Sequence, residues 1–365
     1  MIVFFYSIIL MYCATIGFLV YGFSRIKTVQ NSLFAPQTKF TILVPFRDES
    51  NNLLFLLDSF SKLNYPTHLF EVILIDDDSN ETVVMPDLNY SVSVIKNKRI
   101  SNSPKKDAIT TAIETVKTNW IITTDADCVV SENWLITLDN YIQTHEVSML
   151  VGAVSYSCNS TFLHQFQQFD FTSLQGATIG SFGLRKGFIC NGANFAYTKL
   201  FFQELNGFKG NDHIASGDDV FLLQKAMSRS PEKVHYLKSK NNIVRTKPMD
   251  NWKSLLHQRM RWVSKTNSFQ SFWGVFLGFL VFITNLTWLF AISHVVWQPD
   301  SIQVLFPFFV LKFLVDMILI QQANRFLNEK RVSNIILNSL FYPFFSTTVA
   351  IYSVFGSYQW KGRKF

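Results

Sequence analysis

Two aspartates separated by one residue are the first candidates for chemistry. Asp125 and Asp127, in "TTDADC", follow an apolar, β-branched run. On an extended segment, residues i and i+2 point to the same side. Carboxylates placed in this way can hold a hard divalent cation, and Mg²⁺ or Mn²⁺ would share its remaining ligand positions with substrate phosphates. The alternative for this pair is a solvated turn.

A second group of carboxylates stands in "LIDDDSNE" (74–81). Asp76 and Asp77 end another apolar run, where they could accept hydrogen bonds from a ribose hydroxyl or a base N–H. Ser79 and Asn80 are turn-forming residues, so an ordinary polar turn is the competing interpretation.

Two further segments carry candidate binding residues. "SPKKDAI" (103–109) places Lys105 and Lys106 at the predicted start of a helix, and this combination suits a diphosphate. "CNGANFAYTK" (190–199) offers Gly192, which allows close backbone approach, and Asn194, which supplies an amide. A solvated surface is the alternative for the two lysines.

A candidate general base lies in "SGDD" (216–219), which opens an amphipathic helix. Asp218 and Asp219 could be helix caps, because the helix dipole stabilises acidic residues at an N-terminus. A carboxylate in this position could instead accept the proton of an attacking hydroxyl.

The segment "HQRMRW" (257–262) lies just before a long apolar run. A basic patch beside a membrane binds anionic lipid, which would account for Arg259 and Arg261. It does not account for Gln258 or Trp262, so the segment is also a candidate for the functional site.

The elements that must position these residues alternate in type. Four short apolar segments are predicted strands, and residues 49–63 between the first two have the apolar spacing of a helix. Strand, helix and strand at this spacing predict a parallel sheet, with ligands at the carboxyl ends of its strands. The predicted strands are 40–46, 71–77, 91–96 and 119–125.

The composition indicates a membrane protein. Hydrophobic residues make up 48% of the 365 residues and charged residues 16%, against about 25% in soluble domains. The net charge of +7 suits nucleic acid or an anionic membrane, and the long apolar runs favour membrane lipids over nucleic acid. The four cysteines are widely spaced, so neither a zinc site nor a disulfide framework is expected.

Charge-poor apolar runs divide the chain into three regions. We expect a membrane anchor at 1–24, a cytoplasmic α/β domain at 25–265 and a membrane region at 266–365. A cleavable signal peptide is the alternative for the first run. Lysines and arginines in the flanking loops predict this orientation, and we expect an integral protein of the bacterial inner membrane. The C-terminal helices are predicted at about 272–296, 302–322 and 334–356.

Three features of the chain stay open at the level of sequence. Four simple crossings would put the basic tail outside; alternatively, Pro343 could break the last segment, which could then be re-entrant or interfacial. Lys312 and Asp316 are four residues apart, and simple pairing is favoured over a functional site. The aromatic segment 160–184 fits either an interfacial helix or ordinary core.

These motifs resemble those of family 2 glycosyltransferases, in the membrane-integrated branch. The resemblance covers about residues 40–265, and the motifs follow the order of the family. "TILVPFRDE" resembles the opening of the nucleotide-binding half, "IDDDS" the DDxS element and "KKDAI" the KxxAL element. "DAD" matches the DxD element, "SGDD" resembles the acidic pair and "QRMRW" fits the QxxRW element.

The resemblance implies a fold and a set of residue roles. The fold would be GT-A-like α/β, a Rossmann-type nucleotide-binding sheet with helices on both faces, plus N-terminal and C-terminal transmembrane helices. Asp219 would be the base, and the other catalytic candidates are Asp218, Gln258, Arg261 and Trp262. The metal would bind Asp125 and Asp127. The donor-binding candidates are Pro45, Arg47, Glu49, Asp76, Asp77, Lys105, Asp125, Gly192 and Asn194.

The implied activity is inverting transfer from a nucleotide sugar, expected to be a UDP-sugar. The acceptor would be a lipid-linked or growing glycan, as in polysaccharide biosynthesis. The acidic pair departs from the Thr-Glu-Asp of cellulose and chitin synthases, Ile109 replaces the usual leucine, and the C-terminal membrane region is short. These departures put processivity in doubt, but not sugar transfer.

Two other functions compete with this interpretation. A sugar-phosphate nucleotidyltransferase has a glycine-rich N-terminal signature that this sequence does not show. A non-catalytic membrane partner in an export complex would keep the fold, but intact carboxylates in all three acidic motifs argue against it.

Overall fold

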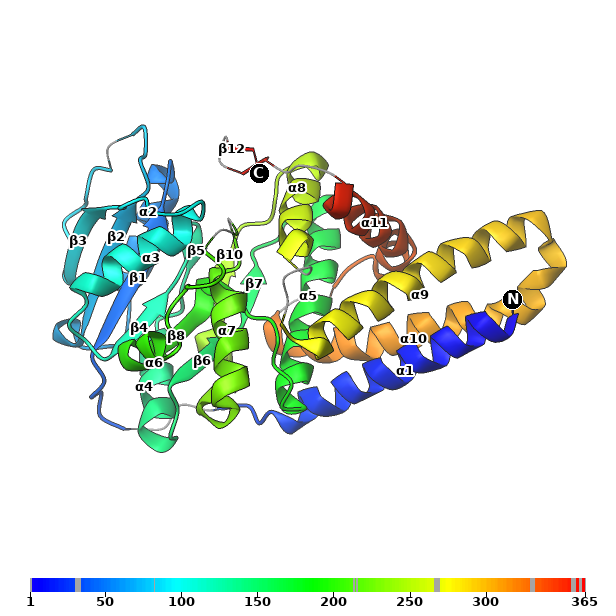
Figure 1. The fold of residues 1–365 in the computed structure, drawn as a ribbon, viewed down its shortest axis with the longest axis horizontal. Coiled ribbons are helices and arrows are strands. Elements are labelled where there is room, and N and C mark those ends of the chain that lie inside the picture. The colour runs from blue at the N-terminus through cyan, green and yellow to red at the C-terminus, as the bar shows by residue number, and fades with distance from the viewer. Residues whose placement is uncertain are drawn as a thin grey trace. The chain divides into compact units, whose positions relative to one another are not determined.

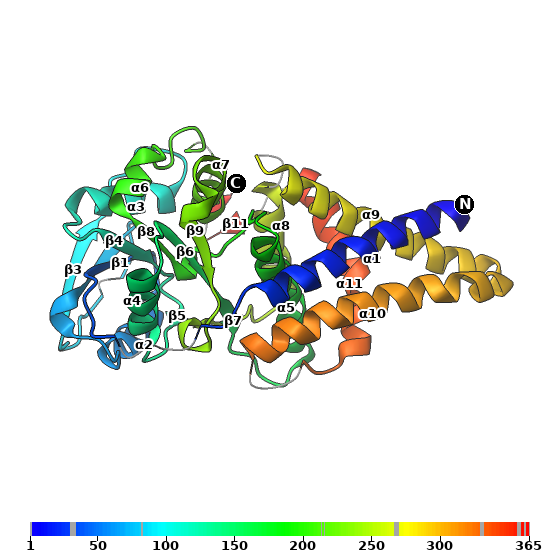
Figure 2. The same cartoon turned by 90° about the horizontal axis from the view of Figure 1, so that it is seen from below.

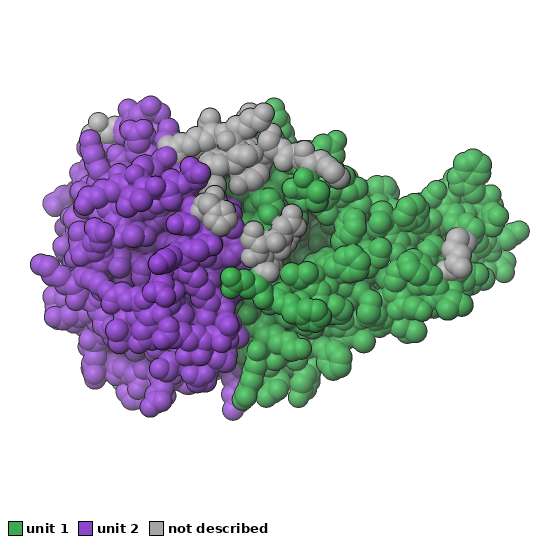
Figure 3. Space-filling view, viewed as in Figure 1, with its two compact units in different colours: residues 1–26, 158–188, 248–365 green, residues 27–157, 189–247 purple. Residues whose placement is uncertain are grey.

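The computed structural model divides the chain into two compact units, which Figure 3 shows in different colours. We call residues 27–157 and 189–247 the sheet unit, and residues 1–26, 158–188 and 248–365 the helical unit. The structure describes residues 2–29, 34–81, 83–212, 214, 216–265, 270–328, 332–355, 359–360 and 363–364.

A seven-stranded mixed sheet forms the centre of the sheet unit (Figure 1). Its strands are β1 (Phe40–Phe46), β2 (Phe70–Asp76), β3 (Ser91–Lys96), β4 (Trp120–Thr123), β6 (Met149–Gly152), β8 (Phe195–Thr198) and β9 (Val234–Leu237). Their order is β3–β2–β1–β4–β8–β6–β9. β8 runs antiparallel to both neighbours, and the other pairs are parallel. A smaller sheet contains β5 (Cys128–Val129), β10 (Val244–Thr246) and β7 (Val154–Tyr156).

Burial explains why the central segments form strands. Ile42 and Val44 of β1 and Leu74 of β2 are fully buried. Because a parallel sheet is covered on both faces, its inner strands are continuous apolar runs rather than alternating ones. Phe46 pairs with Asp76, so the polar residues that follow β1 and β2 begin at the same edge.

Helices cover both faces of the large sheet, as predicted. The helices of this unit are α2 (Ser50–Ser61), α3 (Pro104–Thr115), α4 (Trp134–Thr144), α6 (Lys199–Glu204) and α7 (Asp218–Arg229). Figure 2 shows α3 and α6 on one side of the sheet and α2 and α4 on the other. The rings of Phe60 in α2 and Trp134 in α4 stack with centroids 6.2 Å apart. The structure therefore confirms the predicted α/β class.

The helical unit contains the apolar segments. Its helices are α1 (Ile2–Arg25), α5 (Phe162–Gly183), α8 (Trp252–Val263), α9 (Phe272–Trp297), α10 (Ile302–Leu327) and α11 (Ile335–Phe355). Four segments of the described chain are long and apolar enough to cross a membrane: 2–25, 272–297, 299–327 and 335–354. Candidate membrane helices thus stand at both ends of the chain.

α1 and α5 approach closely because glycines stand where they cross. A Cβ on Gly183 would lie 1.8 Å from the carbonyl oxygen of Gly22, and one on Gly180 would lie 2.4 Å from that of Leu19. Small residues at such a crossing let two helix backbones come together. α10 also packs against α5. The segment 160–184 therefore includes a core helix of this unit.

The ionisable residues of α10 are paired. Lys312 Nζ lies 2.7 Å from Asp316 Oδ2, and both side chains are largely buried. Tyr12 of α1 donates its hydroxyl proton to Asp316 Oδ1 at 2.6 Å. The pairing interpretation is confirmed, and the pair also links α1 to α10.

α11 has a different direction from α9 and α10. It crosses that helix pair at a steep angle in both Figures 1 and 2. Pro343 lies inside α11 without ending it, so of the alternatives left open, a break of the helix at this residue does not occur. Neighbouring groups in a packed bundle can compensate for the one backbone hydrogen bond that proline removes. β11 (Gln359–Trp360) pairs with β12 (Arg363–Lys364) and lies against α8, so the tail returns to α8.

Candidate active site

Three parallel strands bring most of the candidate residues of the sheet unit to one edge. β1 lies between β2 and β4 and runs parallel to both. Asp76 ends β2, Asp77 follows it, and Thr123 ends β4 two residues before Asp125. The carboxyl ends of strands in an open α/β sheet are where ligands bind.

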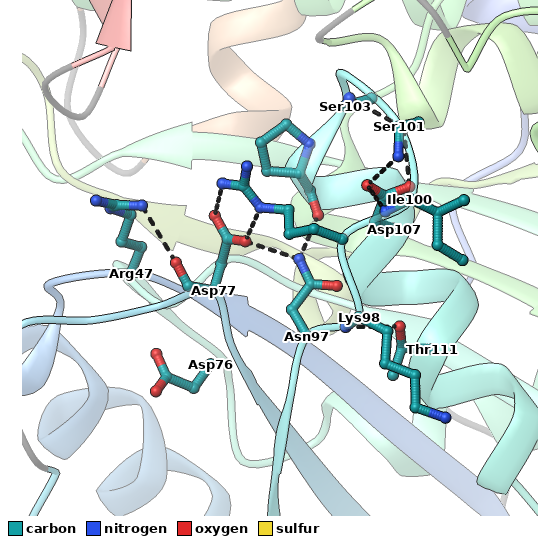
Figure 4. A network of polar contacts seen from close by, with 12 residues as sticks. Arg47, Asp76, Asp77, Asn97, Lys98, Ile100, Ser101, Ser103, Asp107 and Thr111 are labelled. Carbon is teal, nitrogen blue, oxygen red and sulfur yellow. Dashed lines mark hydrogen bonds and ion pairs between the residues drawn. The ribbon is translucent and has the colours of Figure 1, made fainter.

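Asp77 is held by a network of polar contacts, shown in Figure 4. Arg99 donates from Nε to Oδ1 at 2.6 Å and from a terminal nitrogen to Oδ2 at 3.1 Å. Asn97 Nδ2 also donates to Oδ1, at 2.7 Å. A bidentate pair of this kind fixes a carboxylate in one orientation. Asp76 points away from this network and accepts a hydrogen bond from the Ser79 amide at 2.9 Å.

The loops that follow β1 and β2 hold each other in place. Asp48 and Asp78 have positive φ values of 51° and 64°, a conformation that aspartate adopts more readily than most residues. The Asp48 amide donates to Ser79 Oγ at 3.1 Å, and the Asn80 amide donates to Asp48 Oδ1 at 2.8 Å. A polar turn is therefore present here, and it supports the strand-end carboxylates.

The three candidates around the end of β1 lie in different settings. Pro45 is inside the strand. Arg47 donates to the backbone carbonyl of Asp77 at 3.4 Å, which adds it to the network in Figure 4. Glu49 precedes α2 and accepts a hydrogen bond from Asn52 at 2.6 Å.

Lys105 forms the charged centre of the site. This second residue of α3 places Nζ 2.6 Å from Asp125 Oδ1 and 3.4 Å from Asp218 Oδ2. Burial lowers the pKa of Lys105, but the carboxylates of Asp125, Asp218 and Asp219 together outweigh burial and raise that pKa above its ordinary value. The ammonium group is therefore charged throughout the neutral pH range.

Asp219 lies beside this centre, in the first turn of α7. Its Oδ2 accepts a hydrogen bond from the Gly192 amide at 2.7 Å. Gly217 is the N-cap residue just before this helix and has φ at 82°, a conformation that favours glycine. A Cβ on Gly192 would lie 3.1 Å from Lys105 Nζ and 3.2 Å from Asp218 Oδ2, so glycine gives these charged groups room.

Lys106 points into the core instead of toward Asp125. Its side chain is 1% exposed, and Nζ donates to the carbonyl oxygens of Asn211 at 2.5 Å and Ile214 at 2.9 Å. The Phe221 ring centre lies 5.1 Å from the same nitrogen. These contacts tie α3 to the segment before α7. A solvated surface, the alternative for the two lysines, is wrong for Lys106.

Asn194 belongs to the interior of the sheet unit. Trp134 donates to its Oδ1 at 3.1 Å, and its Nδ2 donates to the carbonyls of Ala153 at 2.9 Å and Asn242 at 2.6 Å. The amide is thus occupied within the fold, and its contact with a donor stays a prediction.

Sequence reasoning missed two residues of this region, Asn97 and Arg99, and did not find the inward direction of Lys106. Asn97 directly follows β3, so the rule about strand ends could have found it. Arg99 lies further along the same loop, and only the fold brings it to Asp77. The inward direction of Lys106 has no signal in the sequence, because two adjacent lysines at a helix start also fit a solvated surface.

Asp125 and Asp127 are the residues that fit a divalent cation. Both are partly exposed, and no group of three or more His, Cys, Asp or Glu arranged for a metal occurs in the described ranges. Two carboxylates suit Mg²⁺ or Mn²⁺ when substrate phosphates supply further ligands. Burial, with the charges of Asp127 and Asp125, raises the pKa of the Cys128 thiol, so a thiolate ligand is not expected there.

Gln258, Arg261 and Trp262 belong to the helical unit, on α8. The neighbouring Arg259 has Nε 2.6 Å from Asp170 Oδ2 of α5, and its guanidinium carbon lies 4.2 Å from the centre of the Trp262 ring. This motif therefore contributes to packing between α8 and α5. Its participation in catalysis stays a prediction.

The chain belongs to the glycosyltransferase-like family 2. The family model matches residues 36–265, which contain the strand-end carboxylates, both lysines, "DAD", "SGDD" and "QRMRW". The resemblance inferred from these motifs is thereby confirmed. Among curated proteins, none matches the chain in sequence.

Comparison with solved structures finds a mannosyltransferase that shares this GT-A-like fold. The mannosyltransferase PcManGT from Pyrobaculum calidifontis, in complex with GDP-Man and Mn²⁺, is 13% identical with a TM-score of 0.52, over 96% of this chain and 93% of that one. S. aureus TarS 1–349 is 12% identical with a TM-score of 0.42, over 90% of this chain and 96% of that one. In complex with UDP-GlcNAc, TarS 1–349 is 13% identical with a TM-score of 0.43, over the same shares.

Proposed function

We propose that this family member is a membrane-integrated, inverting glycosyltransferase. It moves a sugar from a nucleoside-diphosphate sugar to a hydroxyl group of an acceptor. The observation that carries the proposal is the contact of Lys105 with Asp125 and Asp218, beside Asp219. This grouping offers a cation for a departing diphosphate and a carboxylate for an incoming hydroxyl.

The donor would bind along the ends of β2 and β4. Asp76 and the oriented Asp77 are suited to accept hydrogen bonds from the ribose or the base. Lys105 would exchange a carboxylate contact for a phosphate oxygen when the donor binds. A divalent cation held by Asp125 and Asp127 would supply further positive charge to the diphosphate. The GDP-Man and Mn²⁺ held by PcManGT support this donor chemistry, and a UDP-sugar remains our expectation.

The transfer step needs one base and one stabilised leaving group. Asp219 would remove the proton of the acceptor hydroxyl, whose oxygen then forms a bond to the anomeric carbon. The bond from that carbon to the diphosphate breaks on the opposite face, through an oxocarbenium-like transition state. Attack from the opposite face inverts the anomeric centre, so an α-linked donor gives a β-linked product.

The acceptor would be a lipid-linked or growing glycan presented at the membrane. Four candidate spanning helices suit an integral membrane protein, and we expect the sheet unit to face the cytoplasm of a bacterial cell. Gln258, Arg261 and Trp262 would then act near the diphosphate and the acceptor. Polysaccharide biosynthesis is the process that such a reaction serves.

The decisive experiment measures release of nucleoside diphosphate by the full chain in native membranes. A panel of UDP- and GDP-sugars would be offered with Mg²⁺ or Mn²⁺, to the unchanged protein, to Asp219→Asn and to Glu232→Gln. Glu232 is an exposed carboxylate of the same unit, so its variant controls for lost charge. Release with one donor that is lost only in Asp219→Asn supports the proposal and identifies the sugar.

Other outcomes separate the rival functions. Donor binding without release, in the presence of lipid and glycan acceptors, would favour a non-catalytic partner of an export complex. Formation of a nucleotide sugar from sugar phosphate and nucleoside triphosphate would favour a nucleotidyltransferase. Either result would overturn the proposed transfer.

A further inference from the structure

Four exposed cations of the helical unit stand where α1, α5 and α10 end. We call these residues the basic collar: Arg25, Arg185, Lys186 and Arg325. They belong to three separate segments of the chain, and the contacts between the helices bring these segments together.

The first contact is the crossing of α1 and α5. A Cβ on Gly183 would lie 1.8 Å from the carbonyl oxygen of Gly22, so the two backbones touch here. Arg25 is three residues beyond Gly22, which is about one helical turn. Arg185 is two residues beyond Gly183. Both arginines therefore lie close to the point where α1 and α5 cross.

The second contact places the end of α10 beside the end of α1. Gln322 Nε2 donates to Ser24 Oγ at 2.8 Å, and the rings of Phe23 and Phe326 lie 6.5 Å apart. Arg325 lies between these two contact residues of α10. It therefore joins the end of α1 at the same end of the helix bundle.

The third contact adds a tryptophan at the start of α9. The chain turns after α5, where Arg185 has φ at 58° and the Lys186 amide donates to the Ser181 carbonyl at 2.8 Å. This turn places Lys186 Nζ 4.7 Å from the centre of the Trp273 ring. Trp273 in turn donates to Ser181 Oγ at 3.0 Å. Tryptophan and lysine are both preferred at the boundary between membrane and water.

Among the described residues of the helical unit, no carboxylate lies close to the basic collar. No ion pair involves any of its four residues in the described part of the chain. Asp170 and Asp316 are paired with Arg259 and Lys312. The other described carboxylates of this unit are Asp250 and Asp300. Asp250 lies near the start of α5 and Asp300 follows α9, whereas the basic collar lies at the end of α5 and the start of α9. These helices of 22 and 26 residues separate the two carboxylates from the collar by roughly 30 Å or more.

We propose that the basic collar binds the phosphate of an anionic phospholipid. Positive charge and apolar surface meet at this place, because Tyr21 and Phe272 are 59% and 85% exposed beside Arg25 and Trp273. A phospholipid carries both matching chemistries, a phosphate for the cations and acyl chains for the apolar helices. Free phosphate would satisfy only the cations. This proposal does not depend on the proposed glycosyl transfer.

The test measures thermal unfolding of the detergent-solubilised full chain with added lipid. Phosphatidylglycerol, phosphatidylcholine and inorganic phosphate would be titrated separately. The collar variant is Arg185→Gln, Lys186→Gln and Arg325→Gln together, and its matched control is Lys117→Gln, Lys233→Gln and Lys253→Gln, which removes equal charge from other exposed positions. Phosphatidylglycerol alone should raise the unfolding midpoint of the unchanged and control proteins. Its apparent affinity should fall about 5-fold for each collar charge removed.

A second measurement covers the case in which the triple variant does not fold. Brominated phosphatidylglycerol in vesicles should quench the fluorescence of Trp273, identified by its loss in Trp273→Phe, and Lys186→Gln should weaken this quenching. Equal quenching by brominated phosphatidylcholine would overturn the proposal. Equal stabilisation of the collar and control variants, or stabilisation by inorganic phosphate alone, would overturn it as well.

Discussion

At the scale of single residues, the site depends on ion pairs between one lysine and the carboxylates around it. Lys105 is the one described side chain that an ion pair joins to both Asp125 and Asp218. Without a cation between them these carboxylates would repel each other, and their desolvation would be costly. A phosphate or a metal ion can enter such a cluster by replacing one charge with another. The same arrangement thus stabilises the carboxylates in the fold and suits a charged ligand.

Asp127→Ala should weaken donor binding only when a divalent cation is present. Asp127 would supply one of two protein carboxylates for the expected metal. Loss of an outer partner of a metal ligand already costs about 10- to 100-fold, so loss of a direct ligand should lower donor affinity by at least this factor. Calorimetry with a nucleotide sugar, with and without Mn²⁺, measures this. Glu114→Gln on the surface of α3 is the matched control. Equal donor affinity for Asp127→Ala and the unchanged protein in Mn²⁺ would remove Asp127 from the metal site.

Lys105→Met should lower stability by an amount that does not vary with pH near neutrality. The pKa of Lys105 is raised above its ordinary value, so its stabilising charge is complete below that value and is lost only at higher, alkaline pH. We expect a loss of about 1–3 kcal/mol, reduced because Asp125 is 38% exposed. Unfolding midpoints between about pH 6 and pH 9 measure it.

Lys117→Met, at an exposed position of the same unit, is the control for Lys105→Met. Its unfolding midpoint should match that of the unchanged protein. A difference between Lys105→Met and the unchanged protein that disappears as the pH rises toward 9 would contradict a raised pKa at Lys105.

At the scale of elements, short contacts between helices and loops decide where the chemical groups stand. α3 presents Lys105 to the carboxylates and anchors the segment before α7 through Lys106. α1 and α5 are joined through glycine backbones. Lys106 and the glycines take no part in the proposed reaction, so variants at these positions separate positioning from chemistry.

Lys106→Met should reduce kcat while leaving donor affinity nearly unchanged. The variant loses both hydrogen bonds to the carbonyls of Asn211 and Ile214, which precede α7 and its Asp219. A small displacement of a base costs about 10- to 100-fold in rate. Steady-state kinetics and donor binding measure the two effects, with Lys98→Met as an exposed control. Loss of donor affinity equal to the loss of kcat would contradict a positioning role.

Gly183→Leu should destabilise the helical unit. Its Cβ alone would lie 1.8 Å from the Gly22 carbonyl oxygen, so α1 must move away from α5. Overpacking of this kind costs about 1–3 kcal/mol or more. Thermal unfolding in detergent measures the change, and Gly17→Leu and Gly278→Leu are matched controls because nothing lies within 4 Å of a Cβ there. Equal midpoints for all three variants would contradict the close crossing.

At the scale of the whole molecule, charge is distributed unevenly along the helical unit. The basic collar stands where α1, α5 and α10 end, whereas the connection between α9 and α10 carries Asp300 and no lysine or arginine. From the positive-inside rule we expect the collar to lie on the cytoplasmic side. The charges at the ends of α1, α9 and α10 agree with this expectation. The C-terminal tail lies against α8 through β11.

Labelling of single cysteines in whole cells should show this orientation. With the four natural cysteines replaced, Gln298→Cys between α9 and α10 should react with a membrane-impermeant maleimide in intact cells. Lys233→Cys, on the sheet unit, should react only after the cells are permeabilised. Labelling of Lys233→Cys in intact cells would place the sheet unit outside and contradict a cytoplasmic donor site.

The sequence by itself determined the class of the protein and most of its candidate residues. Apolar runs of about 20 residues specify membrane helices because the bilayer fixes their length. Strands that end in Asp76 or precede Asp125 specify a ligand edge, because parallel strands present their carboxyl ends together. Both signals are local, so the order of residues along the chain is enough to find them.

Only the tertiary structure decided which polar groups meet. Arg99 pairs with Asp77 across a loop, and Lys106 donates hydrogen bonds to carbonyls more than a hundred positions away. The side-chain amide of Asn194 is hydrogen-bonded to other groups inside the core. The steep direction of α11 also needed the packed helices around it. Side-chain contacts between distant segments depend on how the elements pack, and hydrophobic periodicity carries no information on that.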